Sequence, residues 1–217
     1  MELIKKYRLF SSAIQEWIYA FSVKGFFIKL IFAIAFGLAL LVFLRNYFQY
    51  LEVRNGIVLN DWLLDRFHPR NFSREIFVLL YLSVLTGFLY LFTKPFILLR
   101  ALQTAAIAYS IRIVTLYLVN LDPPAGLIPL IDPIANYFGY GGPLITKDLF
   151  FSGHTASLLI LFLAVKIPWL KMFFLIALIA IVTMLLWQHV HYSLDILGAL
   201  FFTVPAWKIT GRQKPWM

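Results

Sequence analysis

Long apolar runs, interrupted by short polar segments, dominate the pattern of this chain. A helix that crosses a membrane needs about 20 mainly apolar residues. Runs of about this length, separated by turn residues or by clusters of charge, predict six membrane-crossing helices. The fourth run is shorter than a full span, which indicates that this helix begins below the membrane surface. The expected helices cover residues 26–44, 75–92, 96–119, 155–167, 168–187 and 193–209.

The first 25 residues have a different pattern, in which charged and aromatic residues interleave. This segment lacks the continuous apolar core and the small-residue cleavage site of a signal peptide. It instead favours an amphipathic helix that lies on the membrane surface. We therefore expect an all-α, polytopic membrane protein with three parts: an interfacial segment (1–25), a six-helix membrane domain that carries the site (26–209) and a basic cytoplasmic tail (210–217).

Composition supports a membrane protein over a soluble one. The chain is 62% hydrophobic and only 13% charged, whereas soluble domains are about a quarter charged. It has no cysteine, which excludes disulfides and thiolate metal sites. The net charge of +9 would suggest nucleic acid in a soluble protein. Here it fits basic loops on the cytoplasmic side of a membrane, and no nucleic acid partner is expected.

The distribution of basic residues predicts the orientation, because basic loops tend to stay in the cytoplasm. With the N-terminus inside, ten basic residues fall on the inner side and six on the outer side. This favours cytoplasmic N- and C-termini. The inner residues are Lys5, Lys6, Arg8, Lys24, Lys94, Lys166, Lys171, Lys208, Arg212 and Lys214; the outer ones are Arg45, Arg54, Arg66, Arg70, Arg74 and Lys147.

Two histidine clusters stand at the predicted outer ends of helices, in "FFSGHT" and "HVHYSLD". His191 follows His154 by 37 positions, enough for one helix down and one helix back, so both clusters reach the same membrane face. His191 and Asp195 are four apart and share a helix face. The carboxylate would hold one ring nitrogen and leave the other free to attack. His154 could then serve as general acid and base.

Two other interpretations of these clusters stay open. Ser152 or Ser193 could simply cap a helix, with the histidines at the membrane interface. Zinc could be bound by His154, His189, His191 and Asp195. However, on a helix His189 and His191 would point to opposite faces, and the His-Glu-x-x-His spacing is absent. We therefore expect no metal.

A third polar pattern lies in "YSIRIVT", where Tyr109, Arg112 and Thr115 recur every three residues and so lie near one helix face. The planar guanidinium of Arg112 matches phosphate oxygens. Alternatively, Arg112 snorkels to the surface or pairs with an acid such as Asp122 or Asp195. Lys147 and Asp148, which precede the first histidine motif, could contact a lipid headgroup or belong to a solvated loop.

These motifs resemble those of the sphingomyelin synthase-related branch of the type 2 phosphatidic acid phosphatase (PAP2) superfamily. "DLFFSGHT" is similar to the first family motif, with Lys147 in place of its glycine, and "HYSLD" to the second. "YSIRIVT" resembles that branch's Tyr-x-x-Arg-x-x-Thr motif. "LNDWLLD", with Asp61 and Asp65, is a looser match to a fourth motif. The residues that match the two histidine motifs are Asp148, Ser152, Gly153, His154, Thr155, His191, Tyr192 and Asp195.

The resemblance implies a metal-independent lipid phosphotransferase without a cofactor, whose site is on the exoplasmic face. Such an enzyme moves phosphoethanolamine or phosphocholine from a glycerophospholipid to ceramide through a phosphohistidine and releases diacylglycerol. His154, His191 and Asp195 would form its catalytic triad. The substrate-binding residues would be Tyr109, Arg112, Lys147, Asp148, Ser152 and Tyr192.

The expected partners are the phospholipid donor, a ceramide-like acceptor and the membrane, with a homodimer left open. The headgroup and the roles of Asp61, Asp65 and His189 are also open. A phosphatase or a phospholipase C-like hydrolase with water as acceptor is the first alternative, and a non-catalytic transporter or scaffold is the second. The superfamily's phosphatases carry Lys-x6-Arg-Pro and an arginine six residues before the second histidine. Here Lys94 and Arg100 are one residue too close and fall on the predicted inner side, Ala101 replaces the proline, and position 185 is Leu. This departure favours the transferase.

Overall fold

The computed structural model describes residues 2–132 and 145–211, with side chains from residue 12 onward. Within these ranges all regular secondary structure is helical, and no β-strand is present. The expected tail lies outside the described residues beyond position 211. The described helices are α1 (Glu2–Ser22), α2 (Phe26–Glu52), the 3-10 helix η1 (Leu64–Arg66), α3 (Ser73–Phe92), α4 (Pro95–Leu118), α6 (Gly153–Ala164), α7 (Pro168–Trp187) and α8 (Ser193–Ile209).

Four of the seven described α-helices are long and apolar enough to cross a membrane, namely α2, α3, α4 and α7. Their length and composition indicate a multi-pass membrane protein and make four of the six expected crossings candidate spans. Helices α6, with 12 residues, and α8, with 17 residues, are shorter. Their crossing of the membrane stays a prediction.

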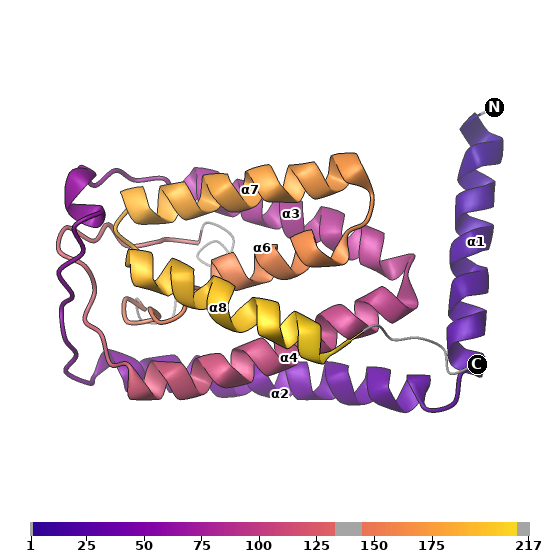
Figure 1. Cartoon of the computed structure of the whole chain (residues 1–217), viewed down its shortest axis with the longest axis horizontal. Helices are drawn as coiled ribbons and strands as arrows, with labels where there is room; N and C mark the ends of the chain where they lie inside the picture. The colour runs from indigo at the N-terminus through magenta and orange to yellow at the C-terminus, as the bar shows by residue number, and fades with distance from the viewer. Residues whose placement is uncertain (1, 133–144, 212–217) are drawn as a thin grey trace.

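Helix α1 runs across the direction of the other helices, at the end of the bundle opposite the long loops (Figure 1). Two contacts fix it to the turn between α3 and α4. The indole Nε1 of Trp17 donates to the carbonyl of Phe92 (2.7 Å), and Lys94 forms an ion pair with Glu16 (3.0 Å). This crosswise direction is compatible with the predicted position of the segment on a membrane surface. That position stays a prediction, because contacts within the chain do not test it.

Helix α6 lies in the middle of the bundle and contacts α3, α4, α7 and α8, while α2 packs along the outside of α4. Helix α8 approaches the segment before α6 closely. A Cβ at Gly198 would lie 2.8 Å from the Phe150 ring, so a larger residue would push this segment away. Glycine at this position therefore lets α8, which follows His191, pack close to the segment that leads into α6.

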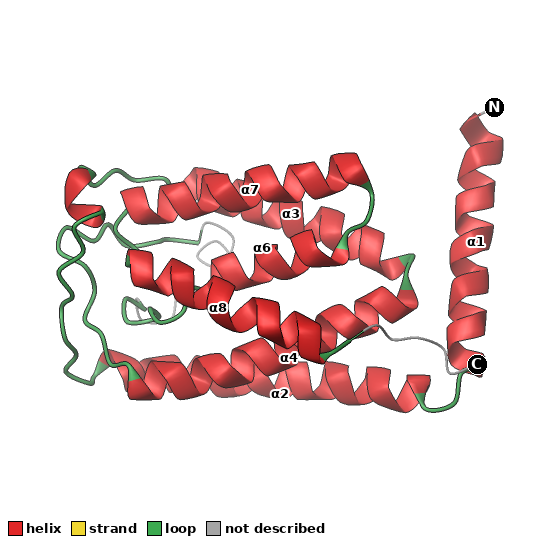
Figure 2. Ribbon diagram, in the orientation of Figure 1, coloured by secondary structure: helices red, strands yellow, loops and turns green. Residues whose placement is uncertain are grey.

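The long loops gather at one end of the bundle (Figure 2) and bind to one another. The N–H of Ile57 donates to the carbonyl of Asn120 (3.1 Å), and the N–H of Asp122 donates to the carbonyl of Ile57 (3.0 Å). Gly56 is needed here because a Cβ would lie 2.5 Å from the backbone of Leu121. The loops after α2 and α4 thus form one layer over the ends of α6 and α8.

Candidate active site

A backbone hydrogen bond joins the two histidine motifs. The N–H of Ser152 donates to the carbonyl of Asp195 (3.1 Å), so the first turns of α6 and α8 lie side by side. The hydroxyl of Ser152 accepts from the N–H of Thr155 (3.4 Å) and from its hydroxyl (3.0 Å). Ser152 is fully buried and serves as the N-cap of α6. Its side chain forms the cap, and the substrate contact expected for it stays a prediction.

The three predicted triad residues lie together at these helix starts. Nδ1 of His191 is 3.0 Å from Oδ2 of Asp195. Because a carboxylate only accepts, Nδ1 carries a proton and Nε2 of the neutral ring keeps its lone pair. The ring of the half-buried His154 stands edge-on to that of His191, with 6.4 Å between centroids. The two imidazoles are therefore neighbours at the same pair of helix starts.

Arg112 reaches the same place from α4. Its guanidinium is 2% exposed; Nε donates to the carbonyl of Phe151 (2.6 Å) and Nη2 pairs with the carboxylate of Asp148. Its planar group also lies over the Phe48 ring, 5.6 Å from the centroid. Of the alternatives left open for Arg112, pairing with an acid is thus observed, although the acid is Asp148 and neither Asp122 nor Asp195. A loop acid pairs with Arg112 instead, because the segment before α6 passes over α4.

Gly153 and Tyr109 hold this arginine against α6. A Cβ on Gly153 would lie 3.4 Å from Cζ of Arg112, so a side chain there would press on the guanidinium. The hydroxyl of Tyr109 lies 2.8 Å from that of Ser157 and donates to the carbonyl of Gly153 (3.3 Å). A cation thus stands beside the first turn of α6, where the helix dipole also favours an anion.

In the structure Lys147 contacts other residues of the protein. The headgroup contact expected for it stays a prediction. Its ammonium pairs with Asp122 (2.7 Å) and donates to the carbonyl of Arg54. Its own N–H donates to the carboxylate of Glu52 (2.6 Å). These contacts fasten the segment before α6 to the end of α2, and they compensate the charge of Lys147 within the protein.

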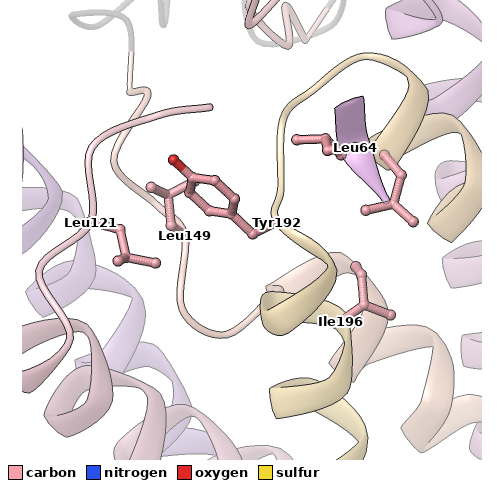
Figure 3. Close-up of a cluster of buried hydrophobic side chains, with 6 residues drawn as sticks. Leu64, Leu121, Leu149, Tyr192 and Ile196 are labelled. Carbon is pink, nitrogen blue, oxygen red and sulfur yellow. The ribbon is translucent and has the colours of Figure 1, made fainter. Parts of the chain in front are cut away.

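Tyr192 likewise has structural contacts. Its ring belongs to a buried cluster and points from the start of α8 toward Leu149 and Leu121 (Figure 3). Its hydroxyl donates to the carbonyl of Asp122 (2.9 Å) and accepts from the N–H of Leu59 (3.2 Å). It is 1% exposed. Tyr192 thus ties the loop layer to α8, and the substrate contact expected for it stays a prediction.

Asp61, whose role the sequence left open, fixes the start of α8. Its Oδ2 accepts from the N–H of Ser193 (2.6 Å), and its Oδ1 accepts from the N–H groups of Leu63 (3.2 Å) and Leu64 (3.3 Å). Burial raises the pKa of this carboxyl, but these hydrogen bonds lower it more, so the pKa lies below its ordinary value. Asp61 is therefore ionised and holds the turn that carries His191.

The site has aromatic neighbours that could not be predicted from the sequence. Phe77 of α3 stands edge-on to the His154 ring at 6.3 Å and stacks on Tyr81 at 5.8 Å. The hydroxyl of Tyr81 donates to Asp132 (2.5 Å). Phenylalanine occurs 22 times in this chain, so no local signal distinguishes Phe77, or Phe48 beside Arg112.

His189 lies apart from the histidine pair. It is in the turn between α7 and α8 with a positive φ of 56°, so the helical alternation expected for His189 and His191 was wrong. Its Nδ1 is 2.7 Å from the carbonyl of Ala125 and its Nε2 is 3.0 Å from that of Phe67. Both ring nitrogens are thus engaged by carbonyls. In the described part of the chain, no group of three or more His, Asp or Glu side chains could hold a metal ion.

The site combines an oriented imidazole with a free nitrogen, a second imidazole and a buried arginine beside a helix N-terminus. This set suits transfer of a phosphoryl group through a nucleophilic histidine. A comparison with curated proteins gave no match. Residues 147–212 match the protein-family model described as PAP2 superfamily C-terminal, a segment that contains both histidine motifs. This match supports membership of the PAP2 superfamily, and with it an enzyme of the lipid phosphatase or phosphotransferase type.

Proposed function

We propose that this protein is a lipid phosphotransferase. It moves phosphoethanolamine or phosphocholine from a glycerophospholipid to ceramide and releases diacylglycerol. The observation that carries the proposal is the pair of imidazoles, 6.4 Å apart, of which one is held through Nδ1 by a buried carboxylate. Such a pair can divide the transfer into two displacements, each with a nucleophile and an acid or base.

In the first displacement, Nε2 of His191 attacks the phosphorus of the donor. The bond from phosphorus to the glycerol oxygen breaks, and His154 protonates that oxygen to release diacylglycerol. In the second, His154 takes the proton of the primary hydroxyl of ceramide, whose oxygen attacks the phosphorus. The bond from phosphorus to Nε2 breaks and returns its electron pair to His191, so both histidines regain their starting protonation.

Arg112 supplies the electrostatic part of the mechanism. In both displacements negative charge increases on the non-bridging phosphoryl oxygens, and a fixed cation in a water-poor site stabilises it strongly. The bonds to Phe151 and Asp148 hold the guanidinium in place. Asp195 stabilises the positive charge that His191 acquires when it is bonded to phosphorus.

The charges near the site favour a phosphodiester donor. Lys147 is paired with Asp122, and Arg112 is paired with Asp148. A phosphomonoester such as phosphatidic acid carries more negative charge than a diester and needs more cationic partners. The transfer to ceramide is favoured over transfer to water by the apolar residues beside the motifs, including the buried Phe151.

The proposal includes the orientation in the membrane. Six helices, α2, α3, α4, α6, α7 and α8, would cross it, with both termini in the cytoplasm and the site on the exoplasmic side. The count of basic residues supports this orientation. So does α1, which lies at the opposite end of the bundle from the site (Figure 1). The partners would be the donor phospholipid and a ceramide-like acceptor, and the chain works without a metal or cofactor.

The test uses purified protein with ceramide and either phosphatidylethanolamine or phosphatidylcholine. We expect a phosphoceramide product together with diacylglycerol, and little turnover of phosphatidic acid. Donor labelled in its phosphate should leave acid-labile label on the protein, which His191→Ala abolishes and His68→Ala, a change in an exposed loop, preserves. Rapid phosphate release from phosphatidic acid, without transfer to ceramide from either donor, would instead identify a hydrolase.

A further inference from the structure

A groove of about 360 Å³ follows the seam between α2 and α4. Its walls are side chains of α2 from Ala33 to Leu44 and of α4 from Leu102 to Tyr109. Apart from the hydroxyl of Tyr109, all of these groups are apolar. Because the groove lies on the surface of a bundle with several candidate membrane spans, its apolar lining suits hydrocarbon.

One end of the groove meets the candidate active site. Tyr109, at this end, contacts Gly153 and Ser157 of α6 through its hydroxyl, and its ring lies 5.9 Å from the Arg112 guanidinium. One turn beyond Leu44 on α2, the ring of Phe48 faces the same guanidinium at 5.6 Å. The groove therefore leads to the cation that would bind the phosphate.

The groove also has the length of one membrane leaflet. Eleven residues separate Ala33 from Leu44, which is about 16 Å at 1.5 Å per residue. Half of the hydrocarbon core of a bilayer is about 15 Å. A lipid whose phosphate lies at Arg112 would therefore extend a chain along the groove to about the middle of the membrane.

Gly37 in the wall of the groove gives independent support. A Cβ at this position would meet no atom within 4 Å, and its backbone has no positive φ that would require glycine. Glycine inside a helix is unfavourable relative to alanine. Neither close packing nor backbone conformation thus accounts for glycine here, whereas any side chain would occupy the groove.

We infer that the groove between α2 and α4 binds one acyl chain of the lipid substrate whose phosphate lies at Arg112. This inference rests on the proposed function, because it takes Arg112 as the phosphate-binding group. The ligand is a lipid with a phosphate headgroup and a chain long enough to pass Gly37. Gly37 lies seven residues from Leu44, or about 10 Å along the helix, so a six-carbon chain ends before it.

The test compares Gly37→Leu with Ala39→Leu, a matched control at an exposed position of α2 outside the groove. Release of diacylglycerol is measured from donors with two 16-carbon chains and from donors with two 6-carbon chains. Each methylene kept out of an apolar site costs about fourfold in binding. Excluding about two methylenes should lower the ratio of long-chain to short-chain turnover on the order of tenfold in Gly37→Leu. Ala39→Leu should keep the wild-type ratio.

A second measurement separates failure of this inference from failure of the proposed function. Phosphatidylethanolamine with a photoreactive group in mid-chain should label peptides from residues 33–44 and 102–109 in the wild type and in Ala39→Leu, and much less in Gly37→Leu. If the wild type turns over neither donor but labelling depends on position 37, the proposed function fails and the groove stands. A wild-type turnover ratio and unchanged labelling in Gly37→Leu would overturn the inference.

Discussion

Replacing Arg112 with lysine preserves the positive charge but removes the planar guanidinium, whose nitrogens donate to two different partners. The guanidinium donates in two directions, from Nε to the carbonyl of Phe151 (2.6 Å) and from Nη2 to Asp148. It is also 2% exposed, so water cannot replace a lost contact. An ammonium group at the end of a shorter, flexible chain would keep one of these two partners and lose the other.

The expected size of the effect follows from these contacts. Losing one hydrogen bond with a charged partner should lower the free energy of unfolding by about 1.5–3 kcal/mol. Losing one fixed donor to the phosphoryl oxygens should lower turnover about 10²- to 10³-fold. Turnover would be measured with saturating donor and ceramide, alongside thermal unfolding of the same preparation, so that a folding defect is separated from a catalytic one.

Arg54→Lys is the matched control. Arg54 belongs to the same end of the bundle, lies over the rings of Tyr50 and Tyr117 and donates to the carbonyl of Tyr117 (3.2 Å), but its side chain has no contact with the histidine motifs. We expect wild-type turnover from it. If Arg112→Lys also matched the wild type in turnover, Arg112 would be a packing residue. The proposed stabilisation of charge on the phosphoryl oxygens by Arg112 would then be wrong.

Three further results are expected. Asp195→Asn should lower turnover on the order of 10³-fold, measured with labelled donor, because a neutral amide does not stabilise positive charge on His191; unchanged turnover would remove Asp195 from the mechanism. EDTA should leave turnover unchanged, whereas loss with recovery on adding zinc would assign the histidine pair to a metal. Asp61→Asn should lower the unfolding free energy by about 1–2 kcal/mol at pH 7. Because the folded pKa of Asp61 is lowered, this difference should shrink as the pH falls below about 4; a pH-independent difference in denaturant unfolding would contradict the role of its charge.

The positions of most helices could be predicted, because the length of each apolar run and the place of the prolines set the helix bounds. Helices α7 and α8 have the predicted bounds, and α7 starts at Pro168. The fourth predicted helix, α6, ends at Ala164 and not at 167, because a residue before proline avoids the helical region and Ile167 is extended. Helix α2 runs on to Glu52, since polar residues after Leu44 end the apolar stretch but not the helix.

The candidate site likewise has contacts that could be predicted from the sequence and contacts that could not. The spacing of His191 and Asp195 is local, so it could be predicted from the helical period. The partners of Arg112 and Lys147 could not, because Asp148 and Asp122 reach them through the path of loops. Asp61 and Ser193 are separated by 132 positions, and no pattern along the chain relates one acid to one distant N–H. Contacts of this kind also give Tyr192 a structural role that its position in the second histidine motif did not predict.

The bond from the Ser152 N–H to the Asp195 carbonyl joins main chain to main chain at the point where α6 and α8 begin. Every residue has this carbonyl, and every residue except proline has this N–H. This bond therefore links the two helix starts without a side chain, and it tolerates exchange of neighbouring side chains that leave the close contact at Gly198 in place. If the proposed function holds, exchange of those side chains could change the acceptor while this main-chain link between the two histidine motifs stays the same.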